Sequence, residues 1–182
     1  KYGLVELSTR YGDCLMPEII TVDVKELKRK KIMKDTLFSP LLVEKVREAL
    51  SRGEQAILFQ NRRGFAPMIE CRGCGWVPHC VNCDVSLTYH KAHNQLVCHY
   101  CGYTYRLPQV CPECKGTEFK MQGFGTEKVE EEIAGQFPAA KVERLDFDTA
   151  RTRTAYERII SDFEKGKTQI LIGTQMLSKG LD

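Results

Sequence analysis

The chain has 182 residues, 42% of them hydrophobic, with a formal net charge of +3 and a mean hydropathy of −0.34. This composition is typical of a globular domain, and no apolar run approaches the length of about eighteen residues that a membrane-crossing segment needs. The positive charge is mild and does not by itself indicate a nucleic-acid partner.

The first seventy residues hold the basic excess, with thirteen Lys and Arg against ten Asp and Glu. Much of it lies in KELKRKKIMK (residues 25–34), which we interpret as a solvated helix face, with a phosphate-contacting stretch as the alternative. PLLVEKVREALSRG (40–53) places its apolar residues on one face and ends at glycine, so it predicts a helix. QAILFQ (55–60) predicts a short buried strand, which leads into the basic loop NRRGFAP (61–67).

Eight of the nine cysteines fall within residues 71–114 as four C-x-x-C pairs. Two residues between thiolates form a tight turn, and two such turns supply the tetrahedron of sulfur that Zn²⁺ accepts. No secretion signal favours disulfides, and repetition of the motif argues against a thioredoxin-like redox pair. The pattern therefore predicts two zinc ions. Gly75, Gly102 and Gly116 fit turns that need positive φ, and Cys14 is expected to be a buried thiol.

The cysteine pairs can combine in two ways. Fourteen residues separate the second pair from the third, which is close to the spacing of a zinc-ribbon hairpin, and VSLTYHKAHNQLV within them alternates like two strands around a turn. We prefer this nested arrangement over pairing in sequential order. The expected ligands are Cys71, Cys74, Cys111 and Cys114 for one zinc ion, and Cys80, Cys83, Cys98 and Cys101 for the other. Because eight cysteines fill two sites, four histidines are expected to be surface or hydrogen-bonding residues: His79, His90, His93 and His99.

Helices and strands alternate again after the cysteines. GFGTEKVEEEIAGQF (123–137) predicts a helix with Thr126 as its N-cap, and TAYERIISDFEKG (154–166) predicts another. AKVERLDFD (140–148) and TQILIGTQ (168–175) predict strands, the second of them continuously apolar. Such repeats predict an α/β fold, a parallel sheet with helices on both faces, which the cysteine region interrupts as a small β insertion.

Four stretches in order, ILFQNRRGFAP, GFGTEKVEEEI, RLDFDT and ILIGTQMLSKGLD, resemble the second RecA-like lobe of PriA-type replication-restart helicases. The resemblance covers residues 19–182, and that family also carries four C-x-x-C pairs between the first two motifs of this lobe. It implies the inter-lobe linker and the first part of the lobe in residues 1–70. It implies the zinc-binding insertion in 71–114 and the second part of the lobe, truncated at motif V, in 115–182.

The resemblance implies a bacterial, cytoplasmic, nucleoid-associated DNA helicase that uses ATP and Mg²⁺ to move 3′ to 5′. The family recognises stalled forks and D-loops, initiates primosome assembly, and works with primosome and single-strand-binding proteins. Loops at the carboxyl ends of parallel strands face a common cleft, where threonine hydroxyls and helix N-terminal amides can hold phosphates. The residues expected to bind DNA or to couple it to the motor are Asn61, Arg62, Arg63 and Gly64 of motif IV, Gly125, Thr126 and Glu127 of the GTE motif, and Gly173, Thr174, Gln175, Lys179 and Gly180 of motif V.

No catalytic residue for nucleotide hydrolysis is expected in this chain. The tripeptide Gly166-Lys167-Thr168 resembles the end of a Walker A motif, but Ser161 stands where the first glycine belongs, and a helix rather than a strand precedes it. A D-E-x-H box is absent, and the family's arginine-bearing motif VI would lie beyond Asp182. We therefore expect a piece of a longer ATPase that does not hydrolyse ATP alone. Its last strand, 168–175, is expected to lie at a sheet edge and to promote self-association.

A zinc-ribbon adaptor that binds nucleic acid or protein without a motor is the alternative function. In that hypothesis the aromatic residues of the cysteine region stack on unpaired bases, whereas otherwise they cover the small zinc core. The flanking α/β pattern argues against an adaptor, because an adaptor does not need it. The aromatic residues concerned are Trp76, Tyr89, Tyr100, Tyr103 and Tyr105.

Overall fold

The computed structural model describes residues 3–6, 17–33 and 36–179, and the chain divides into two compact units, Lys1–Ser39 and Pro40–Asp182. The predictions for Cys14 and Gly180 lie outside the described residues. Among the described residues, no helix has the length and apolar character that a membrane span requires.

The first unit contains one short helix, α1 (Val24–Arg29), in its described part. It begins after Asp23, whose side chain accepts a hydrogen bond from the amide of Glu26, as expected of an N-cap aspartate. No residue of the helix is buried, and Lys30 forms an ion pair with Glu26 at 2.6 Å. Residues 25–32 of the basic run are thus a solvated surface, as interpreted from the composition, whereas Met33 is buried.

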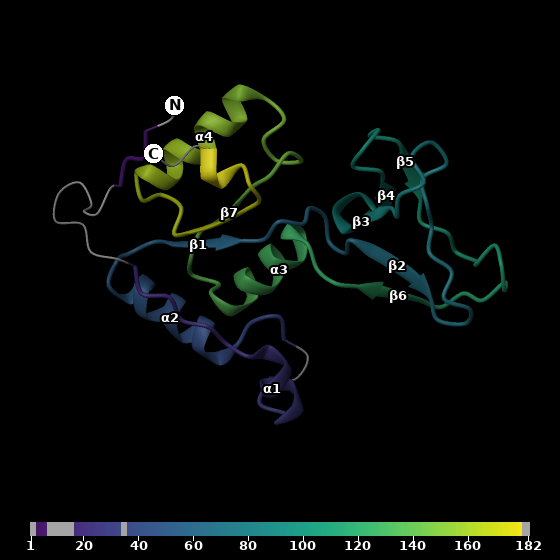
Figure 1. Cartoon of the computed structure of the whole chain (residues 1–182), viewed down its shortest axis with the longest axis horizontal. Coiled ribbons are helices and arrows are strands. Elements are labelled where there is room, and N and C mark those ends of the chain that lie inside the picture. The colour runs from purple at the N-terminus through teal and green to yellow at the C-terminus, as the bar shows by residue number, and fades with distance from the viewer. Residues whose placement is uncertain (1–2, 7–16, 34–35, 180–182) are drawn as a thin grey trace. The chain divides into compact units, whose positions relative to one another are not determined.

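The second unit is built on a parallel sheet of three strands, β1 (Ala56–Phe59), β8 (Ile170–Gly173) and β7 (Val142–Leu145), in the order β1-β8-β7 (Figure 1). Strand β8 is buried along its whole length because it pairs on both sides. The expectation that the last strand lies at a sheet edge is wrong. Strand order depends on where the crossovers carry the chain, and this cannot be read from the order of strands in the sequence.

Helices cover both faces of this sheet. α4 (Arg153–Glu164) lies on one side of the strands in Figure 1, whereas α2 (Pro40–Ser51) and α3 (Thr126–Gln136) lie on the other. Leu171 of β8 packs into the hydrophobic cluster of α4, so its fully buried neighbours Ile170 and Ile172 point to the opposite face. The predicted α/β class, a parallel sheet with helices on both faces, is confirmed.

Strand β1 is less buried than its apolar sequence predicts. Ile57 and Phe59, two residues apart and therefore on one face, are 48% and 60% exposed. Ala56 and Leu58, on the other face, are half-buried. Among the described residues β1 pairs only with β8, which leaves one apolar face of the strand open to solvent.

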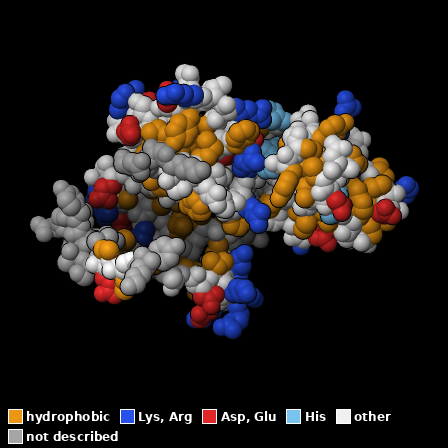
Figure 2. All heavy atoms as spheres, turned by 45° about the horizontal axis from the view of Figure 1, so that its top comes forward, with side chains coloured by type: hydrophobic (Ala, Val, Ile, Leu, Met, Phe, Trp, Pro, Cys, Tyr) orange, Lys and Arg blue, Asp and Glu red, His pale blue; other side chains and the backbone are white. Residues whose placement is uncertain are grey.

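The chain leaves the parallel sheet after β1 and returns to it through an antiparallel module. Strands β2 (Met68–Cys71) and β6 (Phe119–Gln122) pair as a ribbon that leads into and out of the module. A second antiparallel sheet follows the order β3-β4-β5, from Thr88–His90, Gln95–Val97 and Thr104–Arg106. The predicted hairpin is confirmed, with its turn in the short 3-10 helix η1 (Lys91–His93). Side chains of the hydrophobic class are visible across the surface of this module (Figure 2).

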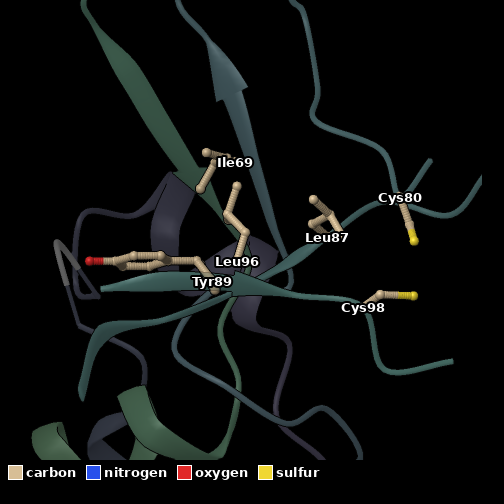
Figure 3. Close-up of a cluster of buried hydrophobic side chains, with 7 residues drawn as sticks. Ile69, Cys80, Leu87, Tyr89, Leu96 and Cys98 are labelled. Carbon is tan, nitrogen blue, oxygen red and sulfur yellow. The ribbon is translucent and has the colours of Figure 1, made fainter. Parts of the chain in front are cut away.

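The module has a small hydrophobic core of its own. Ile69, Leu87 and Leu96 are each 1% exposed and pack against one another beside the ring of Tyr89 (Figure 3). Cys80 and Cys98 belong to the same cluster, and their sulfur atoms point to the side away from Tyr89 (Figure 3). The core is therefore continuous with the cysteines.

Candidate metal centres and groove

All four C-x-x-C pairs form the same backbone turn. The amide of the residue after the second cysteine donates to the carbonyl of the first, with distances of 2.9, 2.9, 2.8 and 3.0 Å. That residue has positive φ in every turn: Gly75, Asp84, Gly102 and Lys115. The prediction of positive φ is confirmed at Gly75 and Gly102 and is wrong at Gly116, because Lys115 occupies this position in the last turn.

The thiols gather in two clusters, and within each cluster the sulfur atoms lie within 4.8 Å of one another. The outer cluster contains Cys71, Cys74, Cys111 and Cys114, and the inner cluster contains Cys80, Cys83, Cys98 and Cys101. This is the nested grouping: the first turn meets the fourth, and the second meets the third.

The spacing of the sulfur atoms fits zinc. The Sγ–Sγ distance is 3.5 Å for Cys71 and Cys114 and 3.6 Å for Cys80 and Cys101. A zinc ion with four thiolates at about 2.3 Å would hold the sulfurs about 3.8 Å apart. These two pairs therefore need only a few tenths of an ångström of adjustment, and the chain has two four-cysteine clusters suited to two zinc ions.

The electrostatics of the thiols also favour a cation. A hydrogen bond from the Tyr105 hydroxyl, 3.3 Å from Cys80 Sγ, lowers the pKa of Cys80 to about 6. In the same cluster the thiol of Cys101 raises the pKa of Cys83 to about 12. Four thiolates at this distance repel one another, so a bound divalent ion is what allows all four to ionise.

Helix α3 begins directly against the NRRG loop. The amides of Gly125, Thr126 and Glu127 donate to loop carbonyls at 3.1, 2.8 and 3.0 Å, those of Phe65, Arg62 and Gly64 respectively. These amides are the ones that a helix leaves unpaired at its start. Since the loop already satisfies them, they are not free to hold a phosphate.

The prediction that Thr126 is the N-cap of α3 is wrong. Gly125 is the N-cap residue, and Thr126 is the first residue of the helix. Its hydroxyl donates to Asp146 Oδ2 at 2.6 Å, and both residues are fully buried. A capping hydroxyl is unnecessary because the loop carbonyls take the helix amides, so the side chain joins α3 to the loop after β7 instead.

Glu127 and His90 connect the module to α3. The Glu127 carboxylate lies 2.8 Å from His90 Nδ1 and accepts from the amide of Lys91 at 3.0 Å. Burial works to raise the pKa of Glu127, but the hydrogen bond and charge of His90 with the charge of Arg144 hold it below its usual value. His90 Nε2 in turn lies 2.9 Å from His99 Nε2. Burial, with the positive charge of Arg63 next in size, lowers the pKa of His99 to about 4.

The histidines divide as the sequence suggested, into surface and hydrogen-bonding residues. His79 and His93 are exposed. His90 is 4% exposed and His99 is half-buried, and the two rings are joined by a hydrogen bond between their Nε2 atoms. Neither belongs to a four-cysteine cluster.

A groove with a volume of about 1240 Å³ separates the module from the carboxyl ends of the sheet strands. The sheet side contributes two of the predicted loops, and the module side contributes the hairpin and the third cysteine turn. The lining includes Asn61, Arg62, Arg63, Thr174 and Gln175 from the loops, and Thr88, His99 and Tyr100 from the module. Figure 2 shows Lys and Arg side chains with histidine beside them where the two parts meet.

Positive charge dominates the groove. Arg62 is exposed, whereas Arg63 lies over the ring of Phe147 with 5.4 Å between its guanidinium carbon and the ring centroid. Arg151 is also on the lining. Both Arg63 and Arg151 approach the carboxylate of Asp148, at 3.9 and 3.8 Å, and among the described residues it is the one carboxylate on this lining. Three guanidinium groups against one carboxylate suit a polyanion.

Sequence reasoning missed Phe147, Asp148 and Arg151 as groove residues. The signal was available, because RLDFDT (144–149) begins at the end of β7 and continues past its carboxyl end, as GTQ does at β8, and NRRG lies past the end of β1. Lys179 ends the 3-10 helix η2 (Leu177–Lys179) beyond the last of these loops. Trp76 is half-buried and off the groove lining, and its carbonyl accepts from the amide of Cys71 at 2.8 Å.

A parallel sheet with helices on both faces, interrupted by an antiparallel module with two four-cysteine clusters, defines the class: an α/β domain that carries a zinc-ribbon-type insertion. Comparison with known proteins gives the particular family. Residues 80–106, which include the whole inner cluster, match the family model described as the PriA DNA helicase Cys-rich region (CRR) domain.

Whole-chain comparisons agree. The chain is 44% identical over 181 residues to the replication restart protein PriA of Bacillus subtilis (strain 168), covering 100% of this chain and 22% of that protein. It is 39% identical over 180 residues to PriA of Haemophilus influenzae and 39% over 183 residues to PriA of Chlamydia muridarum, and covers 24% of each. The chain thus spans about a quarter of the length of these relatives. The resemblance to PriA-type proteins is confirmed: the chain corresponds to a segment of a PriA replication restart protein that includes the Cys-rich zinc region.

Proposed function

We propose that the chain forms part of the path of a single DNA strand through an ATP-dependent helicase that moves 3′ to 5′. The complete protein would recognise stalled replication forks and D-loops in the bacterial cytoplasm and initiate primosome assembly there, with primosome and single-strand-binding proteins as partners. The observation that carries this proposal is the arginine-lined groove between the module and the strand ends.

The two predicted loops at the groove have the chemistry of a sequence-independent path. Arg62 and Arg63 supply charge for phosphates, and Thr174 and Gln175 supply neutral hydrogen-bonding groups on the same lining. Contacts of this kind position a strand without reading its bases. The GTE motif has another role in this proposal. Because Thr126 and Glu127 are engaged with Asp146 and His90, they couple the loops, helix and module mechanically and do not contact DNA.

Replacing both groove arginines is the direct test. Arg62→Ala with Arg63→Ala should weaken binding of a mixed-sequence single-stranded oligonucleotide. It should also flatten the dependence of log affinity on log salt, by about 0.7 for each phosphate that the variant no longer neutralises. Fluorescence anisotropy over a salt series measures both quantities. Zinc content should not change, since neither residue belongs to a cysteine cluster.

The matched control removes two arginines elsewhere. Arg52 and Arg153 are exposed, are paired with Glu54 and Glu157, and lie off the groove lining. Their double alanine variant has the same net charge as the groove variant and should bind with nearly the affinity and salt slope of the unaltered chain. Equal loss in both variants would mean that overall charge, not the groove, holds the DNA.

Tyr100 is the aromatic residue best placed to stack on a base. It is 84% exposed on the groove lining, whereas Tyr103, also exposed at 55%, packs against Tyr105 and lies off the lining. Tyr100→Ala should weaken single-strand binding by about 1–3 kcal/mol, the usual range for one stacked base. Tyr103→Ala should leave DNA affinity unchanged. The stacking role fails if both variants bind as the unaltered chain does, and two zinc ions per chain in each variant show that the module is intact.

ATP and Mg²⁺ belong, in this proposal, to the complete protein. We infer that the chain alone does not hydrolyse ATP, because its sequence lacks the P-loop lysine, the acidic pair and the arginine that such chemistry requires. The adaptor alternative is less favoured. A zinc-ribbon adaptor does not require a parallel sheet, whereas in this chain the loops of such a sheet face the zinc module across a charged groove.

A further inference from the structure

Three side chains with metal-binding chemistry meet outside the cysteine clusters. His90 ends strand β3, His99 lies inside the third cysteine turn, and Asp148 lies in the loop after β7. One ligand atom from each can be chosen so that all three lie within 4.8 Å of one another. The two Nε2 atoms are 2.9 Å apart, close to the separation of about 3.3 Å that two imidazoles have on one tetrahedral zinc ion.

The first histidine is oriented as a metal ligand. Glu127 Oε1 lies 2.8 Å from His90 Nδ1, and a carboxylate at this nitrogen holds the proton there. The lone pair of the ring is then on Nε2, on the side of His99. Metal-binding histidines almost always have such a carboxylate or carbonyl partner on the second nitrogen. Glu127 is itself fixed by the amide of Lys91 at 3.0 Å and by Arg144 at 3.8 Å.

Asp148 supplies the observation that points to an ion. Its Oδ2 atom is buried and has no hydrogen-bond partner, although it lies 3.9 Å from His90 Nδ1. A buried carboxylate oxygen without a donor is costly, and a cation is one way to satisfy it. Its other oxygen, Oδ1, is the atom that Arg63 and Arg151 approach, at 3.9 and 3.8 Å.

We propose that His90, His99 and Asp148 form a third metal site, for a divalent transition ion such as Zn²⁺ or Co²⁺, at the junction of the module and the parallel sheet. Two imidazoles and one carboxylate suit such ions, whereas Mg²⁺ and Ca²⁺ prefer oxygen ligands alone. Three protein ligands leave one coordination position, and it faces the groove because His99 and Asp148 line it. The ion would connect the module to the sheet, since His90 and His99 belong to the module and Asp148 belongs to the loop after β7.

This site should bind more weakly than the cysteine clusters. It offers one negative charge in place of four thiolates, and Arg63 lies close to that charge. The third ion is therefore expected to be lost during purification and gained again on titration. This difference allows the third site to be measured while the cysteine clusters stay filled with zinc.

The test is a Co²⁺ titration of the chain with two zinc ions already bound. One further equivalent of Co²⁺ should bind and give the visible bands of a nitrogen and oxygen site, without the sulfur-to-metal charge transfer of a cysteine cluster. Asp148→Asn keeps the shape of the side chain and removes its charge, so it should lower the Co²⁺ affinity at least tenfold. His99→Asn should do the same.

The exposed histidines of the same module serve as controls. His79→Asn and His93→Asn should bind the third equivalent as the unaltered chain does. If His99→Asn releases a zinc ion from the adjacent cluster, the Co²⁺ affinity of the Asp148→Asn variant alone tests the third site. Asp148 is far from the cysteines in sequence and belongs to neither cluster. No third equivalent in the unaltered chain, unchanged affinity in Asp148→Asn, or equal loss in the controls would overturn the proposal.

Discussion

Gly125 illustrates how one residue fixes the meeting point of three segments. A Cβ atom at this position would overlap the backbone carbonyls of Arg63 and Gly64, and backbone atoms cannot move aside as a flexible side chain does. Gly64 is constrained as well: its φ is +77°, and a Cβ there would lie 2.6 Å from Thr88 of the hairpin. The NRRG loop, the start of α3 and the hairpin therefore approach closely only because glycine stands at both positions.

Two glycine substitutions at α3 should have opposite effects. Gly125→Ala should destabilise the chain by about 1–3 kcal/mol, the usual cost of forcing extra atoms into a packed site. Gly135→Ala, near the end of α3, meets no atom within 4 Å and should stabilise by up to about 1 kcal/mol through helix propensity. Urea unfolding followed by circular dichroism measures both free energies of unfolding. Destabilisation by Gly135→Ala, or none by Gly125→Ala, would contradict these roles of the two glycines.

Residue patterns predict local features well and distant partners poorly. The αL positions at Gly75 and Gly102 follow from the C-x-x-C turn, which is closed within five residues. The capping role expected of Thr126 is wrong because its partner, Asp146, is twenty residues away, whereas a capping interaction is local. The bond from His90 to Glu127 spans 37 residues and has no local signature. Hydrogen bonds of this kind depend on the tertiary fold, which a pattern in one segment does not contain.

At the scale of elements, four copies of one turn produce two different environments. Cys80 and Cys98 start the two inner turns and belong to the hydrophobic cluster of the hairpin sheet. Cys71 and Cys111, which start the two outer turns, are equally buried but do not belong to that cluster. The outer cluster lies at the end of the β2–β6 ribbon, where the amide of Arg72 donates to the carbonyl of Glu118 at 3.0 Å. Each cluster is thus supported by a different pair of strands.

Removing one cluster should therefore leave the other. Cys80→Ser with Cys98→Ser should reduce the zinc content from two ions to one, because both residues belong to the inner cluster. Cys71→Ser with Cys111→Ser should also leave one ion, held in the inner cluster. Elemental analysis after gel filtration gives the stoichiometry. If zinc sites joined the pairs in sequential order, each double variant would damage both sites, so a chain with no zinc would contradict the nested arrangement.

Strand character is predictable at this scale, but strand order is not. The continuous apolar run of β8 correctly indicates burial on both faces. The equally apolar β1 is half-exposed, because its place in the sheet gives it a neighbour on one side only among the described residues. The exposure of Ile57 and Phe59 shows that the burial of a strand depends on its neighbours in the sheet, which its own sequence does not specify.

At the scale of the whole second unit, the two parts rest on separate hydrophobic clusters. Leu87, Leu96 and Cys98 belong to the cluster of the module, and Leu145 and Leu171 to the cluster under α4. Hydrogen bonds and ion pairs, such as those of Glu127, connect the parts, together with the β2–β6 ribbon. Parts joined by polar contacts rather than by a shared core can lose structure separately.

Chelation of zinc should therefore unfold the module and spare the sheet. Each structural zinc supplies on the order of 10 kcal/mol of folding free energy, far more than a core of this size provides by itself. Backbone amides such as those of Leu96 and Cys98 should lose protection from hydrogen exchange, whereas those of Leu171 and Ile172 should keep it. Mass spectrometry of exchanged peptides, with and without chelator, measures protection in the two regions separately. Added zinc should restore the protection of the module. Equal loss of protection in β4 and β8 would mean that the contacts through Glu127 and the NRRG loop make one cooperative unit. In that case, zinc would hold the loops that line the groove in place as well as the module.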